Sequence, residues 1–189
     1  DGGYPQAGCK KKCCKGLWGD DTKRRDVASL GIVDPVAGQR WFIECSPSFP
    51  RQVRRLDEAH PKLSGKIDGI LLTHAHIGHY AGLIHLGREV MGTKGIPVHV
   101  MPRMEKFLRT QGPWSQLVGL NNIRLSPMRD GRVFSLNKRL RVTPFLVPHR
   151  DEFSETVGFR IEGPSKKILW LPDIDKWEKW ETPIEKVLK

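Results

Sequence analysis

A buried strand that ends in a cluster of histidines constrains this chain more than any other feature. Residues 66–73 have an apolar centre and predict a strand, and the run Thr73-His74-Ala75-His76-Ile77-Gly78-His79 lies where that strand gives way to a helix. His74 and His76 are two residues apart, so in extended backbone both rings project from one face and can bind one metal ion. His79 falls on the first helical turn, where it could serve a neighbouring ion.

A zinc site needs more than two imidazoles, because zinc takes about four ligands, one of them water in an enzyme. Another chain segment must therefore supply a third ligand. His149, Asp173 and Asp175 are the candidates, since they follow predicted apolar strands as His74 does. Three of the seven histidines lie within six positions, which favours a metal site over exposed or helix-capping histidines. Asp68 could hydrogen-bond a metal-bound histidine or simply face a turn.

Short strands with helices between them predict an α/β fold of helix-covered sheets. Strands are expected at residues 27–33, 41–45, 66–73, 97–101, 123–125, 132–134, 140–147, 156–161 and 167–171, and helices at 51–60, 79–90 and 103–109. A length of 189 residues suits one compact domain. We therefore expect residues 1–189 to form a single domain that begins with a loop-rich segment, residues 1–25.

Three of the four cysteines, Cys9, Cys13 and Cys14, lie in that loop-rich segment. Their spacing is unlike a secreted disulfide framework and fits thiolate ligands of a structural metal, or reduced thiols. Residues 13 and 14 point apart in an extended chain, so a shared ion requires a turn there. Cys45 follows a strand and is predicted to be a buried thiol.

The net charge of +11, from 32 basic and 21 acidic residues, favours anionic ligands. The basic residues are scattered and not interleaved with aromatic residues, so we expect a small, anionic substrate and no nucleic acid. No apolar run approaches the roughly 18 residues of a membrane span, so no membrane contact is expected, and we predict a cytoplasmic protein. The composition and the distribution of charge do not indicate an oligomeric state.

Two common classes of enzyme are excluded by their missing motifs. No glycine-rich phosphate loop precedes a predicted helix, and no Gly-x-Ser-x-Gly elbow occurs. Nucleotide-dependent enzymes and serine hydrolases of that type therefore do not fit. The first residue is Asp1 rather than Met, so we expect the chain to be incomplete.

The arrangement resembles the metallo-β-lactamase superfamily, in which a strand ends in Thr-His-x-His-x-x-His, an isolated His follows a later strand and a further strand ends in Asp. Three segments, residues 1–9, Glu44-Cys45-Ser46-Pro47-Ser48-Phe49 and residues 73–83, are similar to its pyrroloquinoline quinone biosynthesis protein B branch. The resemblance spans nearly the whole chain. It implies an αββα sandwich, incomplete at both ends in this sequence.

The same resemblance implies a set of metal ligands. His74, His76 and His149 would bind a first ion, and His79 with a bridging Asp173 would bind a second. Gly78 departs from the superfamily, which usually has Asp there as a ligand of the second ion. We therefore expect one or two ions of zinc, with iron as the alternative metal.

These ligands predict a metal-dependent hydrolase that uses a metal-bound hydroxide on an ester, lactone, amide or phosphoester. Asp173 would act as the catalytic residue, by orienting the attacking water and accepting its proton. With iron at the site, the chain would instead be an oxidoreductase related to quinone cofactor biosynthesis. A third hypothesis is a non-catalytic binding or carrier protein whose metal site has decayed, with Gly78 as the sign of that loss.

Overall fold

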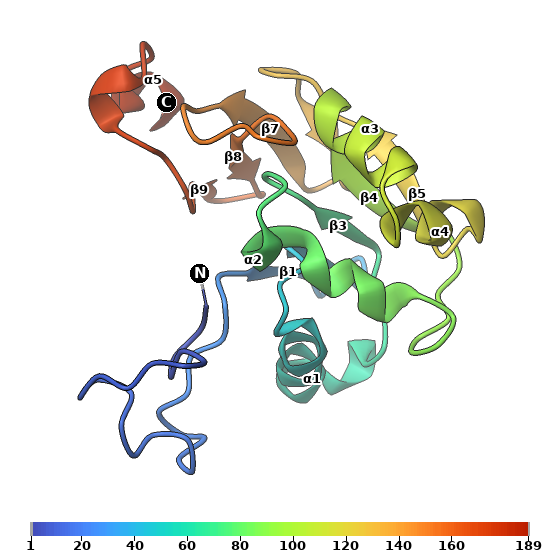
Figure 1. Ribbon diagram of the computed structural model, residues 1–189. Helices are drawn as coiled ribbons and strands as arrows, with labels where there is room; N and C mark the ends of the chain where they lie inside the picture. Colours follow the sequence, from blue (N-terminus) through green and yellow to red (C-terminus); the bar gives the residue numbers. More distant parts are fainter. Residues whose placement is uncertain (1, 189) are drawn as a thin grey trace.

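The computed structural model describes residues 2–188, which form two β-sheets packed face to face (Figure 1). The first sheet has the order β1-β2-β3-β4-β5, with β1 Leu30–Asp34, β2 Gln39–Ile43, β3 Gly69–Leu71, β4 Ile96–Val100 and β5 Ile123–Pro127. β1 and β2 form the predicted antiparallel hairpin, and β2 to β5 run parallel. The second sheet is antiparallel throughout, with β6 Phe134–Ser135, β7 Arg141–Leu146, β8 Val157–Glu162 and β9 Lys167–Trp170.

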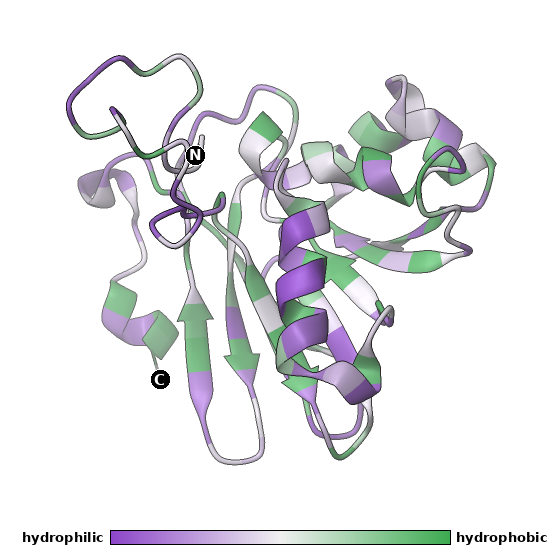
Figure 2. Cartoon of the chain, turned by 90° about the horizontal axis from the view of Figure 1, so that it is seen from below, coloured by the Kyte–Doolittle hydropathy of each residue, from purple (hydrophilic) through white to green (hydrophobic). Residues whose placement is uncertain are grey.

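Helices cover the outer face of the first sheet (Figure 1). They are α1 Phe49–Ala59, α2 Ile77–Tyr80, the 3-10 helix η2 Ala81–Leu86, α3 Pro102–Thr110 and α4 Trp114–Gly119, while a 3-10 turn, η1 Pro61–Leu63, follows α1. A buried cluster that includes Phe42, Ile70, Leu83 and Leu108 fills the space between them and the sheet. The outward side of α1 is hydrophilic, whereas the strands behind it are largely hydrophobic (Figure 2). This amphipathic pattern fixes which side of α1 faces the sheet.

A second core, with Trp41, Leu71, Val142 and Phe159 among its members, lies between the two sheets. On the far face of the second sheet, the ring of Trp180 stacks on Phe145 with centroids 5.8 Å apart. The 3-10 helix η3 Trp177–Lys179 and α5 Ile184–Leu188 follow β9 along the chain. One layer of helices over two facing sheets agrees with the predicted metallo-β-lactamase-like sandwich. None of the helices among residues 2–188 is both long and apolar enough to cross a membrane.

Strand direction brings three loops to one end of the sandwich. β7 and β9 each pair antiparallel with β8, so they run in the same direction as one another. β3 is followed by His74, β7 by His149 and β9 by Asp173, each within three residues of the strand end. The positions predicted as metal ligands are therefore carried by both sheets and meet where the two sheets adjoin.

The helix predicted over residues 79–90 is wrong in its extent. Regular α-helix ends at Tyr80, and the chain continues as the 3-10 helix η2 to Leu86. Gly82 explains the tight path: a Cβ there would lie 2.1 Å from the carbonyl oxygen of Ser46, and its amide donates to the carbonyl of Cys45. This close approach seats the segment after the histidine cluster against the end of β2. The prediction also missed α4, which follows Gly112-Pro113.

A buried ion pair joins β2 to α1. The Arg40 side chain is fully buried, and its Nη2 lies 2.6 Å from Oδ1 of Asp57. Asp57 Oδ1 also accepts the amide of Gly65, and the Arg40 Nε donates to the carbonyl of Lys66. Asp68 accepts the backbone amide of Arg40 at 2.8 Å, so it supports this strand and does not hydrogen-bond a metal-site histidine. One of the two expected roles of Asp68, a hydrogen bond to a metal-bound histidine, is therefore wrong.

His99 on β4 makes the stability of the fold depend on pH. Its ring stacks on Phe134, and burial, with a smaller effect of the Arg124 charge, lowers the pKa of His99 from 6.5 to about 4. Between pH 6.5 and 4 the unfolded chain binds a proton at His99 that the folded chain does not. The contribution of neutral His99 to the free energy of unfolding is therefore complete above pH 6.5 and is lost as the pH falls towards 4.

We expect His99→Gln to remove about 2 kcal/mol of the stability lost between pH 7.5 and 4.5. Urea unfolding of the variant and the wild type at both pH values measures this difference. An equal loss in the two proteins would contradict the assignment to His99.

Candidate metal centre

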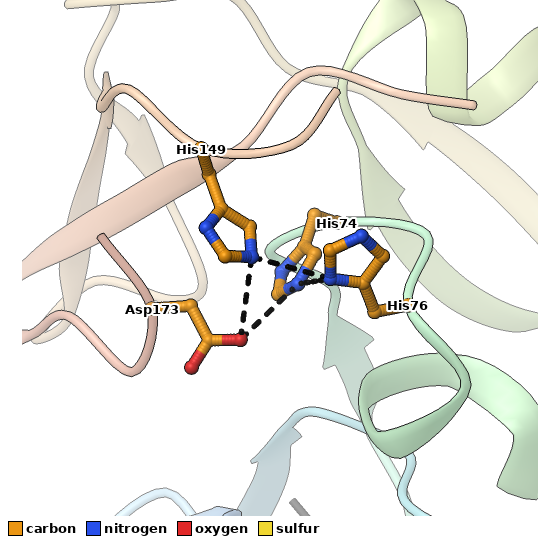
Figure 3. Close-up of side chains that lie close together, drawn as sticks. All are labelled: His74, His76, His149 and Asp173. Carbon is orange, nitrogen blue, oxygen red and sulfur yellow. Dashed lines mark hydrogen bonds and ion pairs between the residues drawn. The ribbon is translucent and has the colours of Figure 1, made fainter. Parts of the chain in front are cut away.

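Four side chains from three loops point towards one another at the end of the sandwich (Figure 3). They are His74 and His76 after β3, His149 after β7 and Asp173 after β9, and one ligand atom from each lies within 4.8 Å of all the others. His74 is buried, and the other three are half-buried. Residues that are far apart in the sequence thus present three ring nitrogens and one carboxylate oxygen to a common space.

The spacing of these atoms fits a tetrahedral zinc ion. Ligands about 2.0–2.1 Å from a tetrahedral ion lie about 3.3 Å from one another. Nδ1 of His76 lies 2.9 Å from Nε2 of His74 and 3.2 Å from Nε2 of His149. Oδ2 of Asp173 lies 3.4 Å from Nε2 of His74 and 3.7 Å from Nε2 of His149. The group therefore passes a geometric test for a shared cation.

Neighbouring groups orient His74 through its other ring nitrogen. The Thr73 hydroxyl donates to Oε1 of Glu44 at 2.6 Å, so its lone pair can accept the N–H of His74 Nδ1, which lies 2.9 Å away. Nε2 of His74 is then left with a lone pair directed at the group. This is the arrangement that a metal-binding histidine needs.

His79 lies beside the four-residue group and not within it. Its two ring nitrogens are each close to a carboxylate, with Nδ1 3.3 Å from Glu44 Oε1 and Nε2 3.2 Å from Asp173 Oδ2. Burial would lower the pKa of His79, but Asp173 and Glu44 outweigh it and raise that pKa to about 9. His79 thus lies between the two carboxylates, where its ring can orient Asp173.

The electrostatics of the other members suit metal binding. Burial lowers the pKa of His74 and of His149, which keeps both rings neutral. The nearby imidazoles of His74 and then His79 hold the pKa of Asp173 well below its usual range, so it is a carboxylate. Neutral imidazoles and an ionised carboxylate are the protonation states that bind zinc.

Glu44 is a residue of this region to which no sequence motif assigns a role. It is fully buried and adopts a positive φ of 70°, which is rare for a residue other than glycine. Its carboxylate contacts both Thr73 and His79, so backbone strain is tolerated where an acid must reach the histidines. The sequence did not reveal it, because the predicted strand over residues 41–45 contains Glu44, whereas β2 ends at Ile43.

The cysteines of the loop-rich segment form a second group. Ligand atoms of Cys9, Cys13 and Cys14 lie within 4.8 Å of one another, and the sulfurs of Cys13 and Cys14 are 3.9 Å apart. The expected turn is present, because the amides of Cys14 and Lys15 both donate to the carbonyl of Lys11. Tetrahedral zinc ligated by sulfur at about 2.3 Å has sulfurs about 3.8 Å apart. Cys45 is a fully buried thiol, as predicted.

Comparison with known proteins defines the class to which this fold and site belong. Residues 39–188 match the family model described as the beta-lactamase superfamily domain. The chain therefore belongs to the beta-lactamase superfamily, and its fold is the metallo-β-lactamase fold.

Within this superfamily the chain is similar to coenzyme PQQ synthesis protein B. The protein of that name from Methylorubrum extorquens is 26% identical over 193 residues, which cover 90% of this chain and 61% of the relative. One from Xanthomonas campestris is also 26% identical, with the same coverage. The chain thus spans about three-fifths of the length of these relatives.

A crystal structure of Zn(2+)-bound PqqB from Methylobacterium extorquens superposes with a TM-score of 0.75 at 21% identity, covering 94% of this chain and 64% of that one. A diphosphatase from the PhnP family superposes with a TM-score of 0.61 at 22% identity, covering 84% of this chain and 57% of the other. These likenesses confirm the predicted fold.

Proposed function

We propose that the chain is a metal-dependent hydrolase, with His74, His76, His149 and Asp173 holding a zinc ion. The observation that carries the proposal is the convergence of three imidazoles and one carboxylate from both sheets, at the separations of tetrahedral ligands. The zinc in a protein of similar fold and the diphosphatase activity in another support the choice of metal and reaction. A bound zinc ion would activate a water molecule as a nucleophile near neutral pH.

The protein's own groups would then orient and stabilise the reactants. Asp173 is fixed by His79 and its ionised carboxylate can accept a hydrogen bond from the attacking water, as we expect of the catalytic residue. Arg150, next to His149, is largely exposed and could bind a negative substrate group. An anionic ester, lactone, amide or phosphoester is therefore the substrate class that we propose.

His79 and Asp173 could support a second ion in the way the superfamily resemblance implies. The nearby Glu44 would add a carboxylate, but its oxygen faces Nδ1 of His79 while Asp173 faces Nε2. The two carboxylates thus lie on opposite sides of one ring. We propose a single ion at this centre, with His79 as the residue that orients Asp173.

The experiment is a metal analysis of the full chain followed by an activity screen. Protein purified without added metal is analysed for zinc and iron, and then tested on anionic esters, lactones, amides and phosphodiesters with each metal restored. Hydrolysis that depends on zinc supports the proposal. A chain that retains neither metal and hydrolyses none of these compounds would instead indicate the binding or carrier protein with a decayed metal site.

A second function is favoured by the relatives named for the synthesis of coenzyme PQQ. With iron in the same group of ligands, the chain would catalyse an oxidation in the formation of a quinone cofactor. Iron in the purified protein, together with dioxygen consumption and no hydrolysis, would favour this function over the first.

We further propose that Cys9, Cys13 and Cys14 hold a structural zinc ion that orders the loop-rich segment. We expect Cys13→Ser to lower the zinc content by one equivalent and to increase proteolysis within residues 2–25, because the ion would join the two ends of the turn. Elemental analysis and limited proteolysis measure these changes, with Cys45→Ser as the control outside the group. Unchanged zinc content in Cys13→Ser would contradict this site.

A further inference from the structure

The loop between β7 and β8 contacts the metal group at a second point besides His149. The hydroxyl of Ser154 accepts the amide of Ala75 at 2.8 Å, and Oε2 of Glu152 lies 2.8 Å from Nε2 of His76. The loop that supplies one of the converging histidines is thus bonded to the segment that supplies two others.

The same loop is fixed to the start of α3. The backbone amide of Arg103 donates to both carboxylate oxygens of Glu155, at 3.1 and 3.0 Å, and its guanidinium donates to the carbonyl of Asp151 at 2.7 Å. The ring of Phe153 packs on Phe107 with centroids 5.4 Å apart. Glu152 is therefore held between fixed neighbours, although 47% of its side chain is exposed.

The contact with Glu152 selects which nitrogen of His76 can bind a cation. A neutral imidazole carries its hydrogen on one nitrogen, and only the other has a free lone pair. A carboxylate at Nε2 favours the form with hydrogen there, which leaves the lone pair on Nδ1. Nδ1 is the atom that lies 2.9 Å from His74 Nε2 and 3.2 Å from His149 Nε2.

We propose that Glu152 is a positioning residue of the metal centre, which acts by fixing the ring of His76 with Nδ1 directed at the other ligands. It thereby makes the loop after β7 contribute two groups to metal binding, His149 as a ligand and Glu152 through His76. The inference rests on the proposed function, because it requires that the four-residue group bind a metal.

The test uses Co²⁺ as the probe in the full chain. Visible absorption follows binding at the histidine group, while thiolate charge-transfer bands in the near ultraviolet report the cysteine group separately. We expect Glu152→Ala to weaken Co²⁺ binding at the histidines about 10- to 100-fold. Glu152→Gln, which keeps an oxygen acceptor, should recover part of that loss.

Glu58→Ala is the matched control, because it removes one exposed carboxylate that pairs only with Arg54 on its own helix. It should bind Co²⁺ as the wild type does. Metal-free Glu152→Ala should unfold at the wild-type temperature to within a few degrees, which separates positioning from a loss of folding.

A double-variant cycle shows whether Glu152 acts through His76. In the His76→Ala background, adding Glu152→Ala should weaken Co²⁺ binding less than twofold. The role of Glu152 would be overturned, and the metal centre left intact, if Glu152→Ala bound Co²⁺ with wild-type affinity. The same would follow if Glu152→Ala weakened Co²⁺ binding equally in the wild type and in the His76→Ala variant. A wild-type chain that binds no Co²⁺ at the histidines would overturn both this inference and the proposed function.

Discussion

Replacing His149 by Ala is expected to lower the affinity of the histidine group for Zn²⁺ by more than about 100-fold. Loss of a group that only orients a ligand costs 10- to 100-fold, and loss of the ligand itself costs more. Among the described residues, His149 is also the single histidine that the second sheet contributes to the group. Hydrolysis that depends on zinc should fall with metal occupancy.

Competition with a chelator and zinc analysis after dialysis measure the effect. His85→Ala is the control, because that histidine lies on η2 and outside the metal group. The same affinity in His149→Ala and the wild type would refute the assignment of His149 as a ligand.

Replacing Asp57 by Ala should destabilise the fold by about 3–4 kcal/mol. The variant leaves the fully buried guanidinium of Arg40 without its opposite charge, and this desolvation cost is much larger than the loss of an exposed pair. Urea unfolding measures the change. The adjacent variant Glu58→Ala, which breaks only the exposed pair with Arg54, should change stability by less than about 0.5 kcal/mol.

A double variant, Arg40→Met with Asp57→Leu, tests the cause. Because it removes both charges and fills the space with apolar groups, it should recover at least half of the loss seen in Asp57→Ala. A double variant as unstable as Asp57→Ala would mean that the hydrogen bonds of Arg40 to the backbone matter more than its charge.

Much of the metal group could be predicted from the sequence, because its members share a recognisable local context. His74 and His76 are two residues apart directly after a buried strand, and His149 and Asp173 each follow an apolar strand. The end of a buried strand is where a polar side chain can reach a site at the edge of a sheet. The predicted hairpin and most of the predicted strands were also confirmed. They could be predicted because the pattern of apolar and polar residues in a strand depends on neighbouring positions alone.

The parts that could not be predicted depend on contacts between distant segments. Glu152 meets His76 across 76 positions, and no local pattern indicates which exposed acid will do so. Arg40 is charged yet wholly buried, which the apolar period of β2 does not reveal. The shortened helix after His79 follows from the approach of Gly82 to the carbonyl of Ser46, a tertiary constraint that overrides helical periodicity.

The division of the ligands between the two sheets has a mechanical consequence. His74 and His76 both follow β3 of one sheet, whereas His149 and Asp173 follow β7 and β9 of the other. An ion held by all four residues would cross-link the two sheets and oppose any motion that separates them. Metal binding at this centre would therefore also stabilise the packing of one sheet on the other.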